Sequence, residues 1–82
     1  MTRAQLLAQA EGLILDAEQM RDRVARVDPS REYLAQAVID DAVRAYVLME
    51  TSSRITARIR MEVSAYYVRA KFISDALNAP IQ

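Results

Sequence analysis

The sequence predicts an all-α fold, a helical hairpin with a long second helix, whose copies assemble into a homo-oligomeric helical bundle. Three observations predict this fold. The composition is helical, with fourteen Ala against one Gly and two Pro. One clear turn signal, Asp28-Pro29-Ser30, divides the chain. Beyond it, an apolar pattern with helical spacing continues as far as Leu77.

Length and composition limit the classes of protein to which the chain can belong. Its 82 residues make one domain, 1–82, near the lowest size at which a single hydrophobic core stabilises a fold alone. Because Cys and His are absent, disulfides, thiol chemistry and the most common general base and metal ligand are excluded. We therefore expect no enzyme, no metal site and no cofactor, and we expect association between copies to support the fold.

The first helix is expected from about Thr2 to Val27. The Thr2 hydroxyl suits an N-cap, and apolar residues follow at alternating spacings of four and three. Gly12 lies in the middle of this helix, where Gly costs about 1 kcal/mol relative to Ala. Close approach of another backbone or simple tolerance would explain it, and the small residues Ala10 and Ala17 favour close packing.

Residues 28–30 form the expected turn. Asp28 suits the N-cap of the next helix, Pro29 its first position, and Glu32 its positively charged end. A turn this short places the two flanking helices side by side and antiparallel.

The second helix is predicted from about residue 30 to Leu77, because neither Gly nor Pro interrupts that segment. Its apolar positions keep one heptad register, in which only Ser52 and Thr56 are polar. Asn78 and Pro80 are expected to end the helix.

A break at residues 51–53 is the alternative, and it would produce a three-helix bundle. Two features favour the continuous helix besides its unbroken register. Glu50 and Arg54 stand in the stabilising i,i+4 order. If the helix broke, Arg54 and Arg58 would lie in the first turns of a new helix, where the positive end of the helix dipole disfavours cations.

The segment after Arg54 is apolar on two opposite sides. The first stripe contains Ile59, Val63, Tyr66, Ala70, Ile73 and Leu77, and the second stripe contains Ala57, Met61, Ala65, Val68 and Phe72. A first helix of about 38 Å cannot cover a second helix of about 70 Å, so another copy must cover the rest. We therefore expect no stable monomer, and we predict self-association through Leu6, Leu13, Met20, Ile59, Val63, Tyr66, Ile73 and Leu77.

Apolar side chains outside this register are predicted to bind a partner protein: Met61, Tyr67, Val68 and Phe72. The predicted function is a non-catalytic oligomerisation and protein-binding module that regulates its partner. A closed homodimer or small oligomer with coiled-coil packing is favoured, because soluble homo-oligomers usually close. A filament is the alternative, because the two halves of the chain carry opposite net charge. Residues 1–53 hold six Arg and nine acids, whereas residues 54–82 hold five cations and two acids, so successive copies would attract each other head to tail.

A basic patch offers a second alternative. Arg54, Arg58 and Arg60, with tyrosines nearby, are typical of a small nucleic-acid-binding protein. Glu62 neutralises part of this row and no helix-turn-helix is visible. We therefore do not expect nucleic acid to be the partner.

The remaining polar residues form no catalytic pattern. The acids occur in pairs, such as Asp40 and Asp41, but none falls at a predicted core position, so we expect them to be solvated. Ser52 and Thr56 lack a neighbouring His or Lys that would activate a hydroxyl as a nucleophile. A role in setting the register, or a hydrogen bond from hydroxyl to backbone, is expected instead.

The layout of residues 29–72 resembles that of the needle subunits of type III secretion systems. Pro29-Ser30, Leu34-Ala35, Tyr46 and Leu48 occupy positions similar to those of such residues in that family. The resemblance implies a subunit without a leader whose two-sided helical hairpin polymerises. The chain departs from the family at residues 49–53, which replace a segment rich in Asn and Gln.

No targeting or membrane segment is expected. The apolar run Leu13-Ile14-Leu15 is too short for the core of a signal peptide, and residues 45–49 are too few to span a bilayer. The expected location is therefore the cytoplasm.

Overall fold

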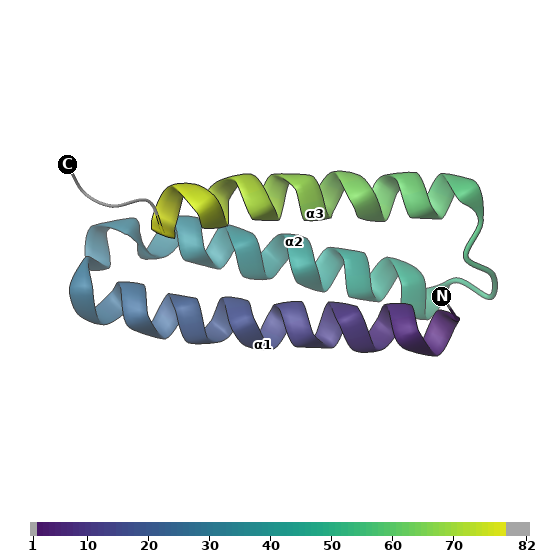
Figure 1. The fold of residues 1–82 in the computed structure, drawn as a ribbon, viewed down its shortest axis with the longest axis horizontal. Helices are drawn as coiled ribbons and strands as arrows, with labels where there is room; N and C mark the ends of the chain where they lie inside the picture. Colours follow the sequence, from purple (N-terminus) through teal and green to yellow (C-terminus); the bar gives the residue numbers. More distant parts are fainter. Residues whose placement is uncertain (1, 79–82) are drawn as a thin grey trace.

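The computed structural model describes residues 2–78. They form α1 (Arg3–Val27), a short 3₁₀ segment η1 (Pro29–Arg31), α2 (Glu32–Thr51) and α3 (Ala57–Asn78). Figure 1 shows α1 and α3 running in one direction and α2 in the other. The predicted all-α class is confirmed for these residues. The last described helix ends at Asn78, and Pro80 lies outside the described residues.

The first helix has well-defined caps at both ends. The Gln5 backbone N–H donates to the Thr2 hydroxyl at 3.1 Å, and the Thr2 N–H donates to the Gln5 side chain at 2.8 Å. This reciprocal pair is a capping box. At the other end the Asp28 backbone N–H donates to the Val24 carbonyl at 2.7 Å, and α1 stops before it.

The connection between α1 and α2 is η1, with Pro29 at its start. The prediction that Asp28 caps the following helix is wrong, because its carboxylate accepts a hydrogen bond from the Ser30 hydroxyl at 2.6 Å instead. This bond joins two side chains, so the Asp28 carboxylate makes no capping hydrogen bond to the backbone that follows it. Glu32 does lie in the first turn of α2, where its charge suits the helix dipole.

The predicted continuous second helix is wrong, because α2 ends at Thr51 and α3 begins at Ala57. Side-chain hydroxyls bond to backbone carbonyls at the end of α2. Thr51 donates to the Val47 carbonyl at 2.7 Å, and Ser52 donates to the Leu48 carbonyl at 2.6 Å. Such bonds offer the backbone an alternative to the helix. The three-helix bundle, the alternative drawn from the sequence, is therefore the observed arrangement.

Two further contacts stabilise the break. The Ile59 N–H donates to the Thr56 hydroxyl at 3.3 Å, which caps the start of α3. The Arg3 side chain donates to the Met49 carbonyl at 3.3 Å and to the Glu50 carbonyl at 2.6 Å. These carbonyls belong to the last turn of α2, where backbone acceptors lack partners within the helix.

The dipole argument against a break involves too little energy to decide the fold. Arg54 lies in the connection, while Arg58, in the first turn of α3, pairs with Glu62 at 3.4 Å. A cation at a helix N-terminus costs about 0.3–1 kcal/mol. Folding α3 back onto α2 buries Val63 and half-buries several other apolar side chains, and full burial of one such side chain contributes about 1.5–3 kcal/mol. Burial therefore outweighs the dipole.

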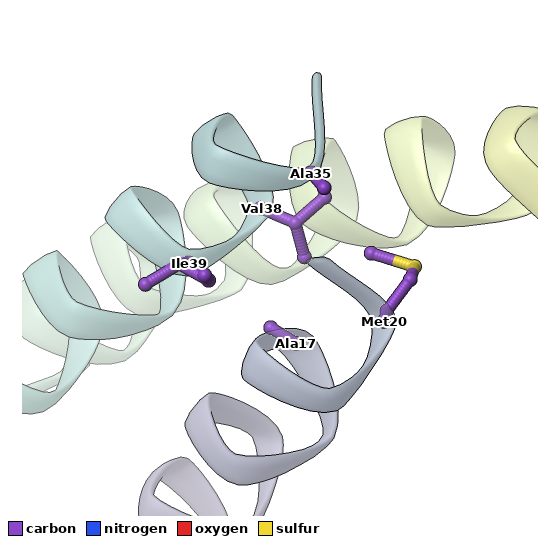
Figure 2. Packing of buried hydrophobic residues seen from close by; sticks show 5 residues of the cluster. All are labelled: Ala17, Met20, Ala35, Val38 and Ile39. Atoms are coloured by element: carbon purple, nitrogen blue, oxygen red, sulfur yellow. The ribbon is translucent and has the colours of Figure 1, made fainter. Parts of the chain in front are cut away.

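Both α1 and α3 pack along α2, and the core forms two clusters. The η1-side cluster contains five buried side chains from α1 and α2, which Figure 2 shows: Ala17, Met20, Ala35, Val38 and Ile39. Half-buried residues of α3 pack against it. Small residues at these contacts let the helix axes approach closely.

The loop-side cluster lies nearer the connection between α2 and α3. It contains Ala10 of α1, Ala45 and Met49 of α2, and Val63 of α3. Met49 is only 1% exposed. Ile55, from the connection itself, packs against this cluster, so the loop is held over the core by an apolar anchor as well as by its caps.

The chain therefore covers the first stripe itself. All six of its residues belong to the two clusters or pack against them: Ile59, Val63, Tyr66, Ala70, Ile73 and Leu77. The expectation that only another copy can cover this stripe is wrong, because it assumed a helix running straight past Ser52. Of the two stripes, only the second remains uncovered. Association between copies stays a prediction.

Candidate interaction surface

The second stripe is exposed on the side of α3 away from the core. Met61, Val68 and Phe72 are 74%, 68% and 76% exposed, and Ala65 is exposed between them. These four residues are the outer face of α3. They line a shallow, open depression. A row of large apolar side chains in water often marks an interaction site, so the outer face of α3 is the candidate site.

Charged pairs border the outer face of α3. Arg58 and Glu62 pair at 3.4 Å near its start, and Lys71 and Asp75 pair at 2.9 Å near its end. All four side chains are largely exposed, so each pair contributes little to stability. Their members can exchange partners at low cost when another surface approaches.

Tyr67 lies apart from the three apolar residues with which the sequence analysis grouped it. Its ring packs against the loop-side cluster, because one residue along a helix turns the side chain by about 100° from Val68. Its hydroxyl is buried and has no hydrogen-bond partner within residues 2–78. This burial raises the pKa of Tyr67. The structure brings together Met61, Val68 and Phe72 but places Tyr67 half-buried on another side of α3, so a role of Tyr67 in partner binding stays a prediction.

Most residues predicted for self-association lie within the chain's own core. Met20 and Val63 are buried. Leu13 is 39% exposed and lines a groove between α1 and α3. The other five pack half-buried against the two clusters: Leu6, Ile59, Tyr66, Ile73 and Leu77. Their role in association stays a prediction, since each already contributes to the folded monomer.

The groove beside Leu13 has α2 as its floor. Val38 and Ala42 form that floor, and the hollow encloses about 480 Å³. Near η1 the groove is bridged, because Arg23 of α1 donates to the Asn78 side chain of α3 at 3.2 Å. The groove is therefore a gap between two helices that both pack on α2, with one end closed.

The three arginines of the predicted basic patch do not form one surface. Arg54 and Arg60 line a small hollow beside the connection together with Arg3. Arg58 lies elsewhere, because two residues along a helix turn the side chain by about 200° from Arg60, and it pairs with Glu62. The structure thus joins two of the predicted arginines with Arg3, which the sequence analysis did not include.

One acid is buried, contrary to the expectation that the acids are solvated. Asp41 is 2% exposed, and its carboxylate accepts hydrogen bonds from Arg69 Nε at 2.9 and 3.1 Å and from Arg69 Nη2. The Arg69 guanidinium also lies 5.9 Å from the centroid of the Tyr66 ring. The bonds with Asp41 raise the pKa of Arg69. This bidentate pair joins α2 to α3 and fixes how they align.

The hydroxyls of Ser52 and Thr56 have structural partners. The expected bond from a hydroxyl to the backbone is confirmed for Ser52, which donates to the Leu48 carbonyl. Within residues 2–78, no three acidic side chains gather as they would around a metal ion. None of the helices in that range combines the length and apolar character needed to cross a bilayer.

Comparisons of the chain with protein-family models, curated proteins and solved structures found no match. The continuous long helix behind the resemblance to needle subunits is also not observed, because the chain turns back at residues 52–56. Function must therefore be inferred from the exposed surface itself.

Proposed function

We propose that this chain is a non-catalytic protein-binding module, whose outer face of α3 packs against a helix of its partner. The observation that carries the proposal is the exposed row of Met61, Val68 and Phe72. The core is complete without these side chains, because the opposite side of α3 covers α2. Phe, Met and Arg are enriched at protein interfaces, and all three types stand on or beside this row.

The hydroxyl and charged groups support a binding role over a catalytic one. Ser52 and Thr56 are engaged in hydrogen bonds that end α2 and begin α3. The buried Asp41 is neutralised by Arg69. A catalytic nucleophile or general base would instead be a hydroxyl or charged group that is not held in a structural hydrogen bond or ion pair and that faces an open site.

A protein partner fits the surface better than nucleic acid does. Acids stand among the cations that border the outer face of α3, and both Arg58 and Lys71 already have carboxylate partners. Nucleic-acid binding relies on cations that neutralise several phosphates together. An apolar row with mixed charges along its edges is instead the pattern of a helix that packs in a protein groove.

Photo-cross-linking in the cells that encode the chain tests the proposal. A photoreactive amino acid replaces Val68, on the outer face of α3, and in a matched control it replaces Tyr33, which is 70% exposed on α2. We expect discrete protein adducts from position 68, and their loss on adding Phe72→Asp. Mass spectrometry then identifies the adduct as this chain or as another protein.

A smear of adducts that is equal from positions 68 and 33 would contradict the proposal. So would discrete adducts that persist in the Phe72→Asp variant, because Phe72 and Val68 are neighbours on one face. Circular dichroism should show the same helix content in all variants, since both positions are exposed.

A further inference from the structure

We infer that the surface that covers the outer face of α3 is the outward side of α1 in a second copy of this chain. This inference rests on the proposed function and names the partner of the same surface. It follows from the spacing, side-chain size and charge of two exposed rows.

The second row lies on α1 and consists of Ala8, Gly12, Leu15 and Gln19, all exposed. These four residues are the outer face of α1. An added Cβ at Gly12 would meet no atom within 4 Å, so no helix of the same chain explains this glycine. Gly at an exposed helix position weakens the helix. A hollow that receives a side chain from another copy accounts for it.

The two rows match in spacing and in size. Successive residues stand four, three and four positions apart in both, so each row runs for about 16 Å. An antiparallel contact that sets Phe72 opposite Ala8 also sets Val68 opposite Gly12. At the next level the order reverses, and Leu15 of α1 meets the small Ala65 of α3. Large residues meet small ones in these three pairs, as in knobs-into-holes packing, and Met61 meets Gln19 in the fourth pair.

The same register brings opposite charges together along one edge. Lys71 comes beside Glu11 of the second copy, and Arg60 comes beside its Glu18. Residues 4–20 of α1 hold three acids and no cation. Among the ion pairs of the described residues, neither Glu11 nor Glu18 takes part in one. Along the other edge the same register sets Glu62 beside Asp16 of the second copy, so charge favours the contact on one edge only, and there it helps to select the orientation.

Contact between two outer faces of α3 is disfavoured by charge. Residues 58–75 hold four cations and two acids, and Arg69 is paired with Asp41 of α2, so two copies of this face would share a small net positive charge and gain no complementary pairs. The outer face of α1 avoids this like charge and also supplies the hollow at Gly12. The favoured contact is therefore between unlike surfaces.

A contact between unlike surfaces lets each copy bind two neighbours, one through α3 and one through α1. Because the contact is antiparallel, successive copies alternate in direction. Such an assembly closes into a ring or extends as a filament, depending on the rotation between neighbours.

Complementation of two variants tests the inference. Phe72→Asp removes the outer face of α3 and leaves that of α1, whereas Gly12→Leu fills the hollow on α1 and leaves α3 intact. We expect wild type to associate and each variant alone to sediment as one chain. An equimolar mixture should form a complex of two chains with a dissociation constant at least about tenfold lower than either variant shows with itself. Tyr33→Asp, on neither row, should associate like wild type.

Folding of the variants is checked separately. Gly12→Leu should raise the melting temperature of the single chain, because Leu favours a helix more than Gly does, so its loss of association cannot be attributed to misfolding. Phe72→Asp should melt near wild type, because Phe72 is 76% exposed.

Three results would overturn the inference. One is a wild-type chain that remains single at every concentration. Another is a Gly12→Leu variant that associates like wild type, which would indicate contact between two α3 helices. The third is a mixture of the two variants that shows no complex. A cross-link from position 68 to a different protein would keep the proposed function while rejecting a second copy as its partner.

Discussion

The two sides of α3 are built from similar residues but have different neighbours. Val63, on the side facing α2, is 6% exposed and packs with Ala10, Ala45 and Met49. Val68, on the other side, is 68% exposed. The same side-chain type thus stabilises the fold in one place and is available for binding in the other. In a bundle this small, an apolar side of a helix is available to bind another protein only when the hydrophobic core is complete without its side chains.

The largest effect is expected from an acid placed on each side in turn. Val63→Asp buries an unpaired carboxylate in the loop-side cluster and should lower the free energy of unfolding by about 4 kcal/mol or more. Val68→Asp should change it by less than about 0.5 kcal/mol, because that position is in water. Urea denaturation at low protein concentration measures both. Equal losses would mean that the two sides do not differ as described.

Proline substitutions sharpen the comparison by testing the break that lets α3 fold back. Arg44→Pro, in the interior of α2, should cost about 3 kcal/mol or more. Ser53→Pro should cost less than about 1 kcal/mol, because the preceding Ser52 already has the extended backbone (φ −93°, ψ 129°) that precedes proline. Thermal melts of the two variants decide the matter. A similar loss in both would indicate a helix running through Ser53.

The ion pair between α2 and α3 is expected to contribute a smaller but measurable amount. Arg69→Met leaves the buried Asp41 without its partner and should cost more stability than the loss of an exposed pair, although less than for a fully buried pair, because Arg69 is half exposed. Lys71→Met breaks an exposed pair and should cost less than about 0.5 kcal/mol. Chemical denaturation of the two variants gives the comparison. If the two losses were equal, Asp41 would not be buried as observed.

The smallest effect concerns Tyr67. Tyr67→Phe removes a buried hydroxyl that has no partner within residues 2–78, and should leave stability unchanged or raise it by up to about 1 kcal/mol. Tyr33→Phe, at an exposed position, is the matched control.

The same variant should change how stability depends on pH. Burial raises the pKa of Tyr67 in the folded chain, so its contribution is fully present below the unfolded pKa of about 10 and is lost as the pH rises through the folded pKa. Wild type should therefore lose stability in alkali, and Tyr67→Phe should lose less. Melting curves between pH 8 and about 11 measure this difference. An identical alkaline loss in both proteins would contradict the burial of the hydroxyl.

Local signals in the sequence predicted the parts of the fold that depend on neighbouring residues. The N-cap at Thr2 and the turn at Pro29 are formed by residues within a few positions of each other. The sequence places Met61, Val68 and Phe72 opposite the first stripe, and this position predicts their exposure. The expectation that another copy covers the first stripe is wrong. Tyr67 does not share the face of these three residues, because adjacent residues on a helix point about 100° apart.

The break between α2 and α3 could not be deduced from periodicity. Each helix keeps its apolar spacing because of its own core contacts, so an apolar spacing that continues past a break does not show that one helix continues there. The registers of α2 and α3 happen to coincide across Ser52 and Thr56, so the pattern looked continuous. The contacts that end α2 include Arg3, which is distant in the sequence. The pairing of Asp41 with Arg69 is likewise a long-range contact without a local signal.

A single distance measurement tests most directly the central claim that α3 folds back over α2 and leaves its second stripe exposed. The chain has no Cys, so Tyr33→Cys and Asp75→Cys allow spin labels at two exposed positions. Both lie at the η1 end, where Arg31 donates to the Ala76 carbonyl at 3.0 Å. Double electron–electron resonance, with labelled chains diluted in unlabelled wild type, should give a distance below about 30 Å, since packed helices lie about 10 Å apart. A distance of about 60 Å, as in one continuous helix, would contradict the fold and with it the exposed surface on which the proposed function depends.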